Sequence, residues 1–356
     1  MTNTPPPGAA FAVRLWLACL ATQELLTMYL GVRLGLYAEL AERGPATVDE
    51  LAARTGYAHR YLREWLEQQA VAGILGCDDG PDRRYSLGPG QREVLIESDS
   101  PLSLAAMAIL PVGGVAGALP ELLKAFRTGD GVPDAAFGED WRTGHSGANR
   151  ALFRHSLVGW IARHLPELHD RLRRAPSRVA DLGCGAGWAA IALATAYPLA
   201  RVQGFDVDEP TLADAAEHAA RAGLADRVTF EARDCATPPE TGDFDLVCVF
   251  DALHELAEPV AVLASAAAMR APGGQVLVMD AKVADEFTAP ADEVERFQYA
   301  TSVLHCLPAC LSGPRSAGTG TVMRADTVRA YAAQAGFHQV RTLDVPDRFH
   351  RLYLLT

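Results

Sequence analysis

The second half of this chain shows the hydrophobic pattern of a parallel sheet. From residue 178 onward, short continuous apolar runs are separated by helical stretches of about 10–15 residues. The apolar runs lie at 178–182, 201–205, 228–231, 244–250 and 275–280. Strands that are apolar throughout are typical of a parallel sheet covered by helices on both faces. Two further runs, 339–343 and 349–355, are close enough to form an antiparallel edge, so residues 175–356 predict an α/β domain.

The first half has a helical pattern. Residues 1–8, with three successive prolines, are predicted to be a disordered tail. Residues 9–97 predict a winged helix, because a capping box at Thr47 and Glu50 opens one helix, a second covers 58–72, and a short hairpin follows. Residues 98–174 lack strand alternation and are predicted to be a helical linker and cap over the later domain.

The apolar segment 11–32 raises the question of a membrane span. Arg14, Gln23 and Glu24 interrupt it, whereas a span needs about 20 apolar residues with few or no charges. A buried helix, within the fold or between subunits, is the favoured interpretation.

Composition narrows the classes of partner. The 356 residues are 49% hydrophobic and 21% charged, as in an ordinary globular protein. The net charge of −12 argues against a polyanion, and Glu64 and Glu67 lie beside Arg60 and Arg63 on the second helix of the predicted winged helix. Seven cysteines, an odd number scattered along the chain, favour a reducing cytoplasm over a disulfide framework. We therefore expect a cytoplasmic protein that binds no membrane and is unsuited to nucleic acid.

The stretch 179–187 predicts a strand, a tight turn and a helix. Its glycines, Gly183, Gly185 and Gly187, allow backbone angles closed to other residues and let a ligand approach the main chain. Glycine turns also join strands to helices for packing reasons, so the turn alone leaves both interpretations open. A dinucleotide fingerprint places its third glycine where this chain has Trp188, which disfavours that class of ligand.

Aspartates end four of the predicted strands: Asp181, Asp206, Asp234 and Asp251. Ligands of such sheets bind outside the carboxyl ends of the strands, where Asp206 could accept hydrogen bonds from ribose hydroxyls and Asp234 one from an adenine amino group. A single aspartate is more often a cap or turn residue. Four at successive strand ends indicate a site that repels polyphosphates and attracts a sulfonium.

The order of these motifs resembles that of the class I S-adenosylmethionine-dependent methyltransferases over about the last half of the chain. The resemblance rests on 179–187, Asp206, Asp234, the run 244–247 and the turn 270–274. As a whole, the chain resembles bacterial small-molecule O- and C-methyltransferases whose N-terminal winged helix dimerises. The segments that carry this wider resemblance are 61–66, 302–308 and 318–324.

The resemblance implies a Rossmann-like sheet of seven strands, S-adenosylmethionine as cofactor, S-adenosylhomocysteine as its product, and a homodimer. It implies that the backbone of 183–187 contacts the methionine moiety, Asp206 the ribose and Asp234 the adenine. The other residues expected to line the cofactor site are Asp181, Cys184, Val207, Cys235, Phe250 and Asp251.

His254 is the first candidate base. Methyl transfer from a sulfonium is an in-line displacement that needs alignment and, for a hydroxyl acceptor, removal of a proton. His254 follows the fourth strand, which opens toward the expected methyl group. Plant-like O-methyltransferases have aspartate and tryptophan after their catalytic histidine, where this chain has Glu255 and Leu256. The alternative is that His254 caps or packs the next helix.

An insertion at 281–325, expected to form part of the substrate pocket, supplies a second histidine, His305. With His254 and either Glu255 or Asp251, it would make a two-histidine, one-carboxylate metal site suited to a keto-acid or catechol-like acceptor. The favoured interpretation is that no metal is bound, and the histidines act on the acceptor directly.

Several functions remain open at this stage. The favoured one is methyl transfer to an oxygen or carbon atom of a small molecule, which His254 or His305 positions or deprotonates. A further catalytic candidate is His155 on a predicted helix over 149–172, unless it is an ordinary surface or core histidine. The alternatives are a winged-helix transcriptional regulator that senses S-adenosylmethionine or a metabolite, and an inactive binding scaffold.

Overall fold

The computed structural model describes residue 6 and residues 8–237, 242–313 and 315–356. The predicted disordered tail, 1–8, lies largely outside these residues. The chain divides into two compact units, Met1–Ala116 with Glu139–Ala148, and Gly117–Gly138 with Asn149–Thr356. The segment 98–174, which was expected to form one linker and cap, is thus shared between the two units.

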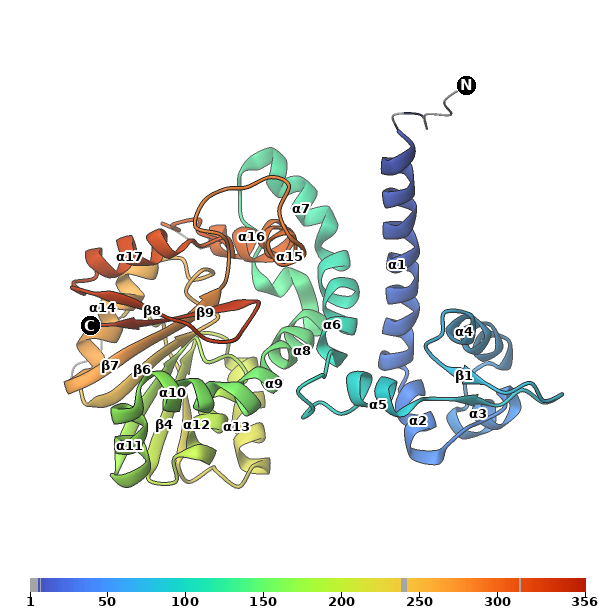
Figure 1. Cartoon of the computed structure of the whole chain (residues 1–356), viewed down its shortest axis with the longest axis horizontal. Coiled ribbons are helices and arrows are strands. Elements are labelled where there is room, and N and C mark those ends of the chain that lie inside the picture. Colours follow the sequence, from blue (N-terminus) through green and yellow to red (C-terminus); the bar gives the residue numbers. More distant parts are fainter. Residues whose placement is uncertain (1–5, 7, 238–241, 314) are drawn as a thin grey trace. The chain divides into compact units, whose positions relative to one another are not determined.

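A seven-stranded sheet in the order β5-β4-β3-β6-β7-β9-β8 is the centre of the second unit (Figure 1). Its parallel strands are β3 (Ser177–Leu182), β4 (Ala200–Asp206), β5 (Val228–Ala232), β6 (Phe244–Phe250) and β7 (Arg270–Ala281). The last two strands, β8 (Val340–Leu343) and β9 (His350–Leu355), run antiparallel, and β9 lies between β7 and β8. The predicted α/β class and antiparallel edge are confirmed.

Helices cover both faces of this sheet (Figure 1). On one face, α10 (Val158–His164), α11 (Pro166–Arg174) and α12 (Trp188–Ala196) pack against alternate strand residues such as Leu246 and Cys248. On the other, α14 (Pro259–Met269) and α17 (Ala325–Gln334) pack against Val247 and Val249. The central strands are apolar throughout because successive side chains enter opposite cores. The helix between β4 and β5 is α13 (Glu209–Arg221).

The predicted helix over 149–172 is wrong as a single element. The structure has α9 (Arg150–Leu152), a π-helical turn (Phe153–Leu157), α10 and α11 instead. The break between α10 and α11 falls at Leu165, whose φ of −134° is not helical. The cause is Pro166, because the proline ring disfavours the helical conformation in the residue before it.

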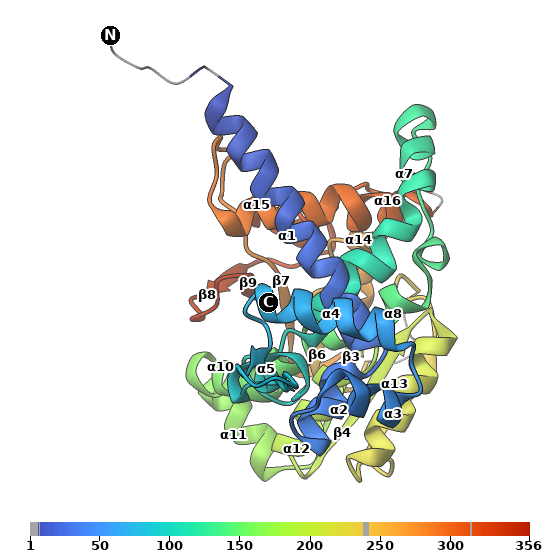
Figure 2. The same cartoon turned by 90° about the vertical axis from the view of Figure 1, so that its right-hand side faces the viewer.

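The insertion 281–325 contains α15 (Glu293–Thr301), a π-helical turn (Ser302–Cys306) and α16 (Leu307–Leu311), which follow one another as a single helical run (Figure 2). Earlier parts of the second unit are most of α7 (Ala116–Thr128) and a 3₁₀ turn (Asp134–Phe137). Val132 N donates a hydrogen bond to the carbonyl oxygen of Pro308, which joins the earlier segment to the insertion.

The first unit contains the predicted winged-helix elements. They are α2 (Leu36–Arg43), α3 (Val48–Thr55), α4 (His59–Val71), β1 (Gly76–Cys77), β2 (Tyr85–Ser86) and α5 (Pro89–Leu95). The capping box is confirmed, since Glu50 N donates to Thr47 Oγ1 and Thr47 N donates to the Glu50 carboxylate. Further helical elements are α1 (Ala9–Arg33), α6 (Ala105–Ile109), a π-helical turn (Leu110–Val115) and α8 (Gly138–Ala148).

The N-terminal half of α1 is apolar and exposed within this chain, whereas Met28 and Val32 in its C-terminal half pack against the core of the first unit. Consecutive side chains from Phe11 to Leu17 are exposed, and Trp16 retains 68% of its surface. By length and composition alone, Ala9–Arg33 and Ala105–Thr128 could each cross a membrane. Apolar helices that are buried inside a protein or between subunits have the same composition.

Candidate functional site

The turn after β3 lies against the loop after β6. Gly183 has a φ of +69°, and a Cβ atom there would lie only 2.8 Å from Cβ of Ala252. Gly185 has a φ of +47°, yet a Cβ atom there would meet nothing within 4 Å. Gly183 is therefore required by packing, whereas Gly185 leaves open space beside the main chain, where a ligand can approach.

Asp206 connects the end of β4 to this turn. Its Oδ2 accepts a hydrogen bond of 2.9 Å from Gly185 N, and its Oδ1 accepts one of 2.8 Å from Val207 N. The Val207 side chain is 69% exposed at the same edge of the sheet. The carboxylate is thus held in a fixed orientation at the carboxyl end of the strands.

Asp181 is buried beside Asp206 and gives the site an unusual electrostatic character. Burial, with a smaller contribution from the nearby Asp206 charge, raises the pKa of Asp181 to about 7. Within the described residues, Asp181 Oδ2 is buried without a hydrogen-bond donor. Burial also raises the pKa of the Cys184 thiol, which keeps it protonated. A positively charged ligand would relieve this crowding of acids.

Asp234 and Cys235 follow β5, the neighbour of β4. Asp234 is exposed, and its Oδ1 accepts a hydrogen bond of 2.9 Å from Ala236 N in a local turn. Cys235 is buried, and burial raises the pKa of its thiol to about 12. The structure therefore places both residues at the carboxyl edge of the sheet, with Asp234 toward solvent.

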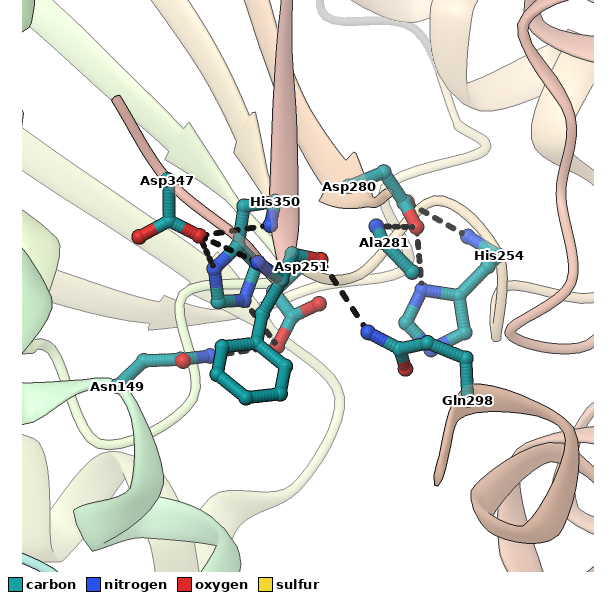
Figure 3. Close-up of polar contacts among 9 residues, drawn as sticks. Asn149, Asp251, His254, Asp280, Ala281, Gln298, Asp347 and His350 are labelled. Atoms are coloured by element: carbon teal, nitrogen blue, oxygen red, sulfur yellow. Dashed lines mark hydrogen bonds and ion pairs between the residues drawn. The ribbon is translucent and has the colours of Figure 1, made fainter. Parts of the chain in front are cut away.

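Phe250 and Asp251 end β6. Phe250 is buried, with its ring centroid 6.0 Å from that of Phe153. Asp251 has a φ of +54°, which is strained for a residue with a side chain, and its carboxylate accepts a hydrogen bond from Asn149 Nδ2 (Figure 3). The aspartate is thereby held at the point where the strand ends.

His254 is buried and paired with an aspartate of the next strand. Its Nδ1 lies 2.8 Å from Oδ1 of Asp280, and its backbone N–H donates to the other oxygen of that carboxylate (Figure 3). Burial by itself would lower the pKa of His254, but the charge and hydrogen bond of Asp280, together with the contact with Cys306, raise the pKa well above its usual value. Asp280 thus fixes the direction of the ring and stabilises its protonated form.

His305 is also buried but pairs with a different carboxylate, that of Asp134. Its Nε2 lies 2.9 Å from Oδ1 of Asp134, its Nδ1 lies 3.6 Å from Oε2 of Glu255, and the Phe137 ring packs edge-on against it. Burial lowers the pKa of His305, but the hydrogen bond to Asp134 and the Glu255 charge raise it overall to about 9. His305 lies in a π-helical turn, a local form that is frequent at functional sites.

The two-histidine, one-carboxylate arrangement considered from the sequence does not form among the described residues. Among the described residues, groups of potential ligands within 4.8 Å of one another are His254–Glu255–Cys306, Asp134–Glu255–His305 and Asp251–His254–Asp280. No such group contains both histidines, because each imidazole is turned toward a carboxylate of its own. Glu255 is common to two of the groups.

The structure does not bury His155 with the other histidines. It lies in the π-helical turn Phe153–Leu157, and its side chain is exposed, whereas His254 and His305 are buried. Its role as a catalytic candidate stays a prediction.

Several residues near the site were missed from the sequence: Asn149, Asp280, Asp347 and His350. Asp280 could have been selected from the sequence, because it lies at the end of a predicted strand, as the four selected aspartates do. Asp347 and His350 carried no comparable signal. Their segment reaches β6 only because β9 is inserted next to β7.

Comparisons with known proteins assign both parts of the chain to domain types. Residues 174–323 match a methyltransferase domain, and residues 22–96 match an Rv2258c-like winged HTH domain.

Among curated relatives, 27-O-demethylrifamycin SV methyltransferase of Amycolatopsis mediterranei is 35% identical over 32% of this chain and 43% of its own length. Phenazine O-methyltransferase PhzM of Lysobacter antibioticus is 27% identical over 56% of this chain and 58% of its own. The chain thus spans less than two thirds of these relatives.

Solved structures share the fold over nearly the whole chain. Mitomycin 7-O-methyltransferase MmcR has a TM-score of 0.73 at 21% identity, with 98% of both chains covered. Human N-acetylserotonin methyltransferase, solved in complex with SAM, has a TM-score of 0.69 at 18% identity, with 100% of this chain and 99% of the other covered.

Proposed function

We propose that this protein, whose chain joins a winged helix-turn-helix domain to a methyltransferase domain, transfers the methyl group of S-adenosylmethionine to an oxygen or carbon atom of a small molecule. The observation that carries the proposal is the position of the buried His254–Asp280 pair. It follows β6, whose loop packs directly against the glycine turn after β3. A proton acceptor and a ligand-binding turn thus lie at one edge of the sheet.

The residues at this edge fit S-adenosylmethionine. Open space at Gly185 would admit the ligand against the main chain, and Asp206 would accept hydrogen bonds from the ribose. Asp234 would accept one from the adenine, and Asp251, fixed by Asn149 at the end of β6, would accept one from the ammonium group of the methionine end. The buried Asp181 oxygen without a donor adds negative potential, which favours a sulfonium over a polyphosphate.

The chain's own contribution to the reaction is orientation and proton transfer. When bound, the cofactor would supply an electrophilic methyl group. His254 in its neutral form would take the proton of an acceptor hydroxyl or acidic carbon, and Asp280 would stabilise the resulting imidazolium. His305 and Glu255, held by Asp134 and the insertion, would form the wall that orients the acceptor.

Cofactor binding is the direct test of this proposal. Calorimetry is expected to show binding of S-adenosylmethionine and S-adenosylhomocysteine, and Asp206→Ala is expected to abolish it, because the turn and the ribose lose a shared acceptor. Asp214→Ala, an exposed aspartate on α13, should bind as the native chain does. Absence of binding by the native chain at millimolar cofactor would contradict the proposal.

The winged helix is better suited to subunit contact than to DNA. Arg60 and Arg63 on α4 pair with Glu64 and Glu67, which removes net positive charge from the helix that would enter a DNA groove. The exposed apolar side chains of α1 require an apolar surface to pack against, and α1 of a second copy of this chain provides such a surface. We accordingly propose a cytoplasmic homodimer that involves α1.

A further inference from the structure

A second histidine lies between two carboxylates on the opposite side of Asp280 and Ala281 from His254 (Figure 3). His350 is the first residue of β9. Its Nδ1 lies 3.0 Å from Oδ1 of Asp347, and its Nε2 lies 4.0 Å from Oδ2 of Asp251. Asp347 is fixed in turn, because the same oxygen accepts hydrogen bonds from the backbone N–H groups of Phe349 and His350.

This arrangement favours a positively charged His350. When Nδ1 donates to Asp347, only the imidazolium has a second N–H to present to Asp251. Burial lowers the pKa of His350, but the bond to Asp347 and the charges of Asp251, Asp347 and Asp280 raise it overall. A neutral ring would turn a lone pair toward the Asp251 carboxylate instead.

We infer that His350 is a positioning residue, which holds the Asp251 carboxylate in place to bind the ammonium group at the methionine end of the cofactor. The inference rests on the proposed function. Asn149 donates a hydrogen bond to the Asp251 carboxylate, and His350 attracts the same carboxylate electrostatically. The two contacts fix the direction of this side chain, whose backbone has an unfavourable positive φ. His350 itself does not need to touch the cofactor.

His350 lines a cavity of about 370 Å³ between α17 and the strands β8 and β9. Lys282 lies in the wall of this cavity, and its Nζ donates to the carbonyl oxygen of Asp347. The other charged groups of the cavity are Asp285, Arg329, Asp344 and Arg351.

The test compares two ligands that differ in the amino-acid end, which carries the ammonium group together with a carboxylate. S-adenosylhomocysteine carries it, and methylthioadenosine retains the adenosine and sulfur without the amino acid. His350→Gln is expected to weaken S-adenosylhomocysteine binding at pH 7 about tenfold, the range of one charge-assisted contact, and methylthioadenosine binding less than about twofold. His338→Gln, an exposed histidine of the same unit, should change neither affinity.

The pH dependence gives a second readout. The ratio of the affinity of the native chain for S-adenosylhomocysteine to that of His350→Gln should fall as the pH rises through the pKa of His350, because the other groups of the site titrate in both proteins. Asp181 acts in the opposite sense, because its ionisation near pH 7 adds negative charge and should strengthen binding as the pH rises.

Equal loss of both ligands in a folded His350→Gln variant, or no loss of either, would overturn the inference. So would a ratio of native to His350→Gln affinity for S-adenosylhomocysteine that does not fall as the pH rises. Failure of the native chain to bind either ligand would overturn the proposed function and, with it, this role of His350. Selective loss of S-adenosylhomocysteine supports both.

Discussion

At the scale of single residues, the chemistry at the sheet edge is set by which carboxylate each histidine faces. His254 faces Asp280, His305 faces Asp134, and His350 faces Asp347 and Asp251. Each carboxylate raises the pKa of its histidine against the opposing effect of burial. The carboxylates therefore favour the protonated form of all three imidazoles, most strongly in His254 and His305, and any step that needs a neutral ring should become faster as the pH rises.

Asp280→Asn should separate the two effects of this carboxylate on His254. Because Asp280 raises the pKa of His254, its loss should shift the rise of kcat with pH to lower pH. The maximal kcat should fall roughly 100-fold, since the ring loses the partner that orients it and stabilises its cation. The measurement is kcat against pH with an acceptor found by screening.

The matched control is Asp326→Asn, an aspartate that is 86% exposed on α17. It should leave the pH profile unchanged. A profile for Asp280→Asn with the native midpoint would show that Asp280 does not control the protonation of His254.

At the scale of elements, π-helical turns and short loops bring distant segments together. The π-helical turn Ser302–Cys306 carries His305, and the 3₁₀ turn Asp134–Phe137 supplies both its hydrogen-bond partner and the aromatic ring against it. The two turns are far apart in sequence. Their contact joins the insertion to the segment Asp134–Phe137, which precedes the sheet in the sequence.

Asp134→Asn tests this connection through stability. The folded pKa of His305 is raised to about 9, so its pairing stabilises the fold fully below the unfolded pKa, about 6.5, and this contribution disappears as the pH rises through about 9. Asp134 is 63% exposed, which limits the expected loss to about 0.5–1 kcal/mol at pH 6.

Denaturant unfolding at pH 6 and at pH 10 measures this difference, which should vanish at the higher pH. NMR titration should also show a lower pKa for His305 in the variant. An equal loss of stability at both pH values would mean that Asp134 acts by packing or turn formation rather than through the charge of His305.

At the scale of the whole molecule, the uncovered apolar helix α1 is the feature that a single copy of the chain does not explain. A helix that is apolar on all sides is normally covered, and exposed apolar patches mark contacts with other proteins or with a membrane. The dimer proposed above covers α1 with an identical surface.

Trp16→Glu should convert the dimer into a monomer, because Trp16 is 68% exposed on α1 and a buried charge at a subunit contact is costly. Sedimentation velocity measures the change in mass. Leu199→Glu adds the same charge at an apolar residue that is 49% exposed before β4, and it should stay dimeric. A native chain that sediments as a monomer, or partitions into lipid vesicles, would contradict the proposal.

The α/β class, the parallel direction of the first five strands of the seven-stranded sheet, the capping box and the glycine turn could all be predicted from the sequence. These features depend on local chemistry and hydrophobic periodicity, which residues close together in the sequence determine. The helix over 149–172 was misjudged because Pro166 and a π-helical turn interrupt a periodicity that otherwise continues.

What only the tertiary structure decided is the pairing of charges across the sheet. Asp280 meets His254 because β6 and β7 are neighbours, and His350 reaches Asp251 because β9 returns between β7 and β8. His254 and His305 do not form a shared site for the same reason. Each imidazole faces a carboxylate from a different segment, Asp280 or Asp134. Sequence determines which chemical groups are present, whereas chain topology determines which of them share a buried environment and therefore which protonation states they adopt.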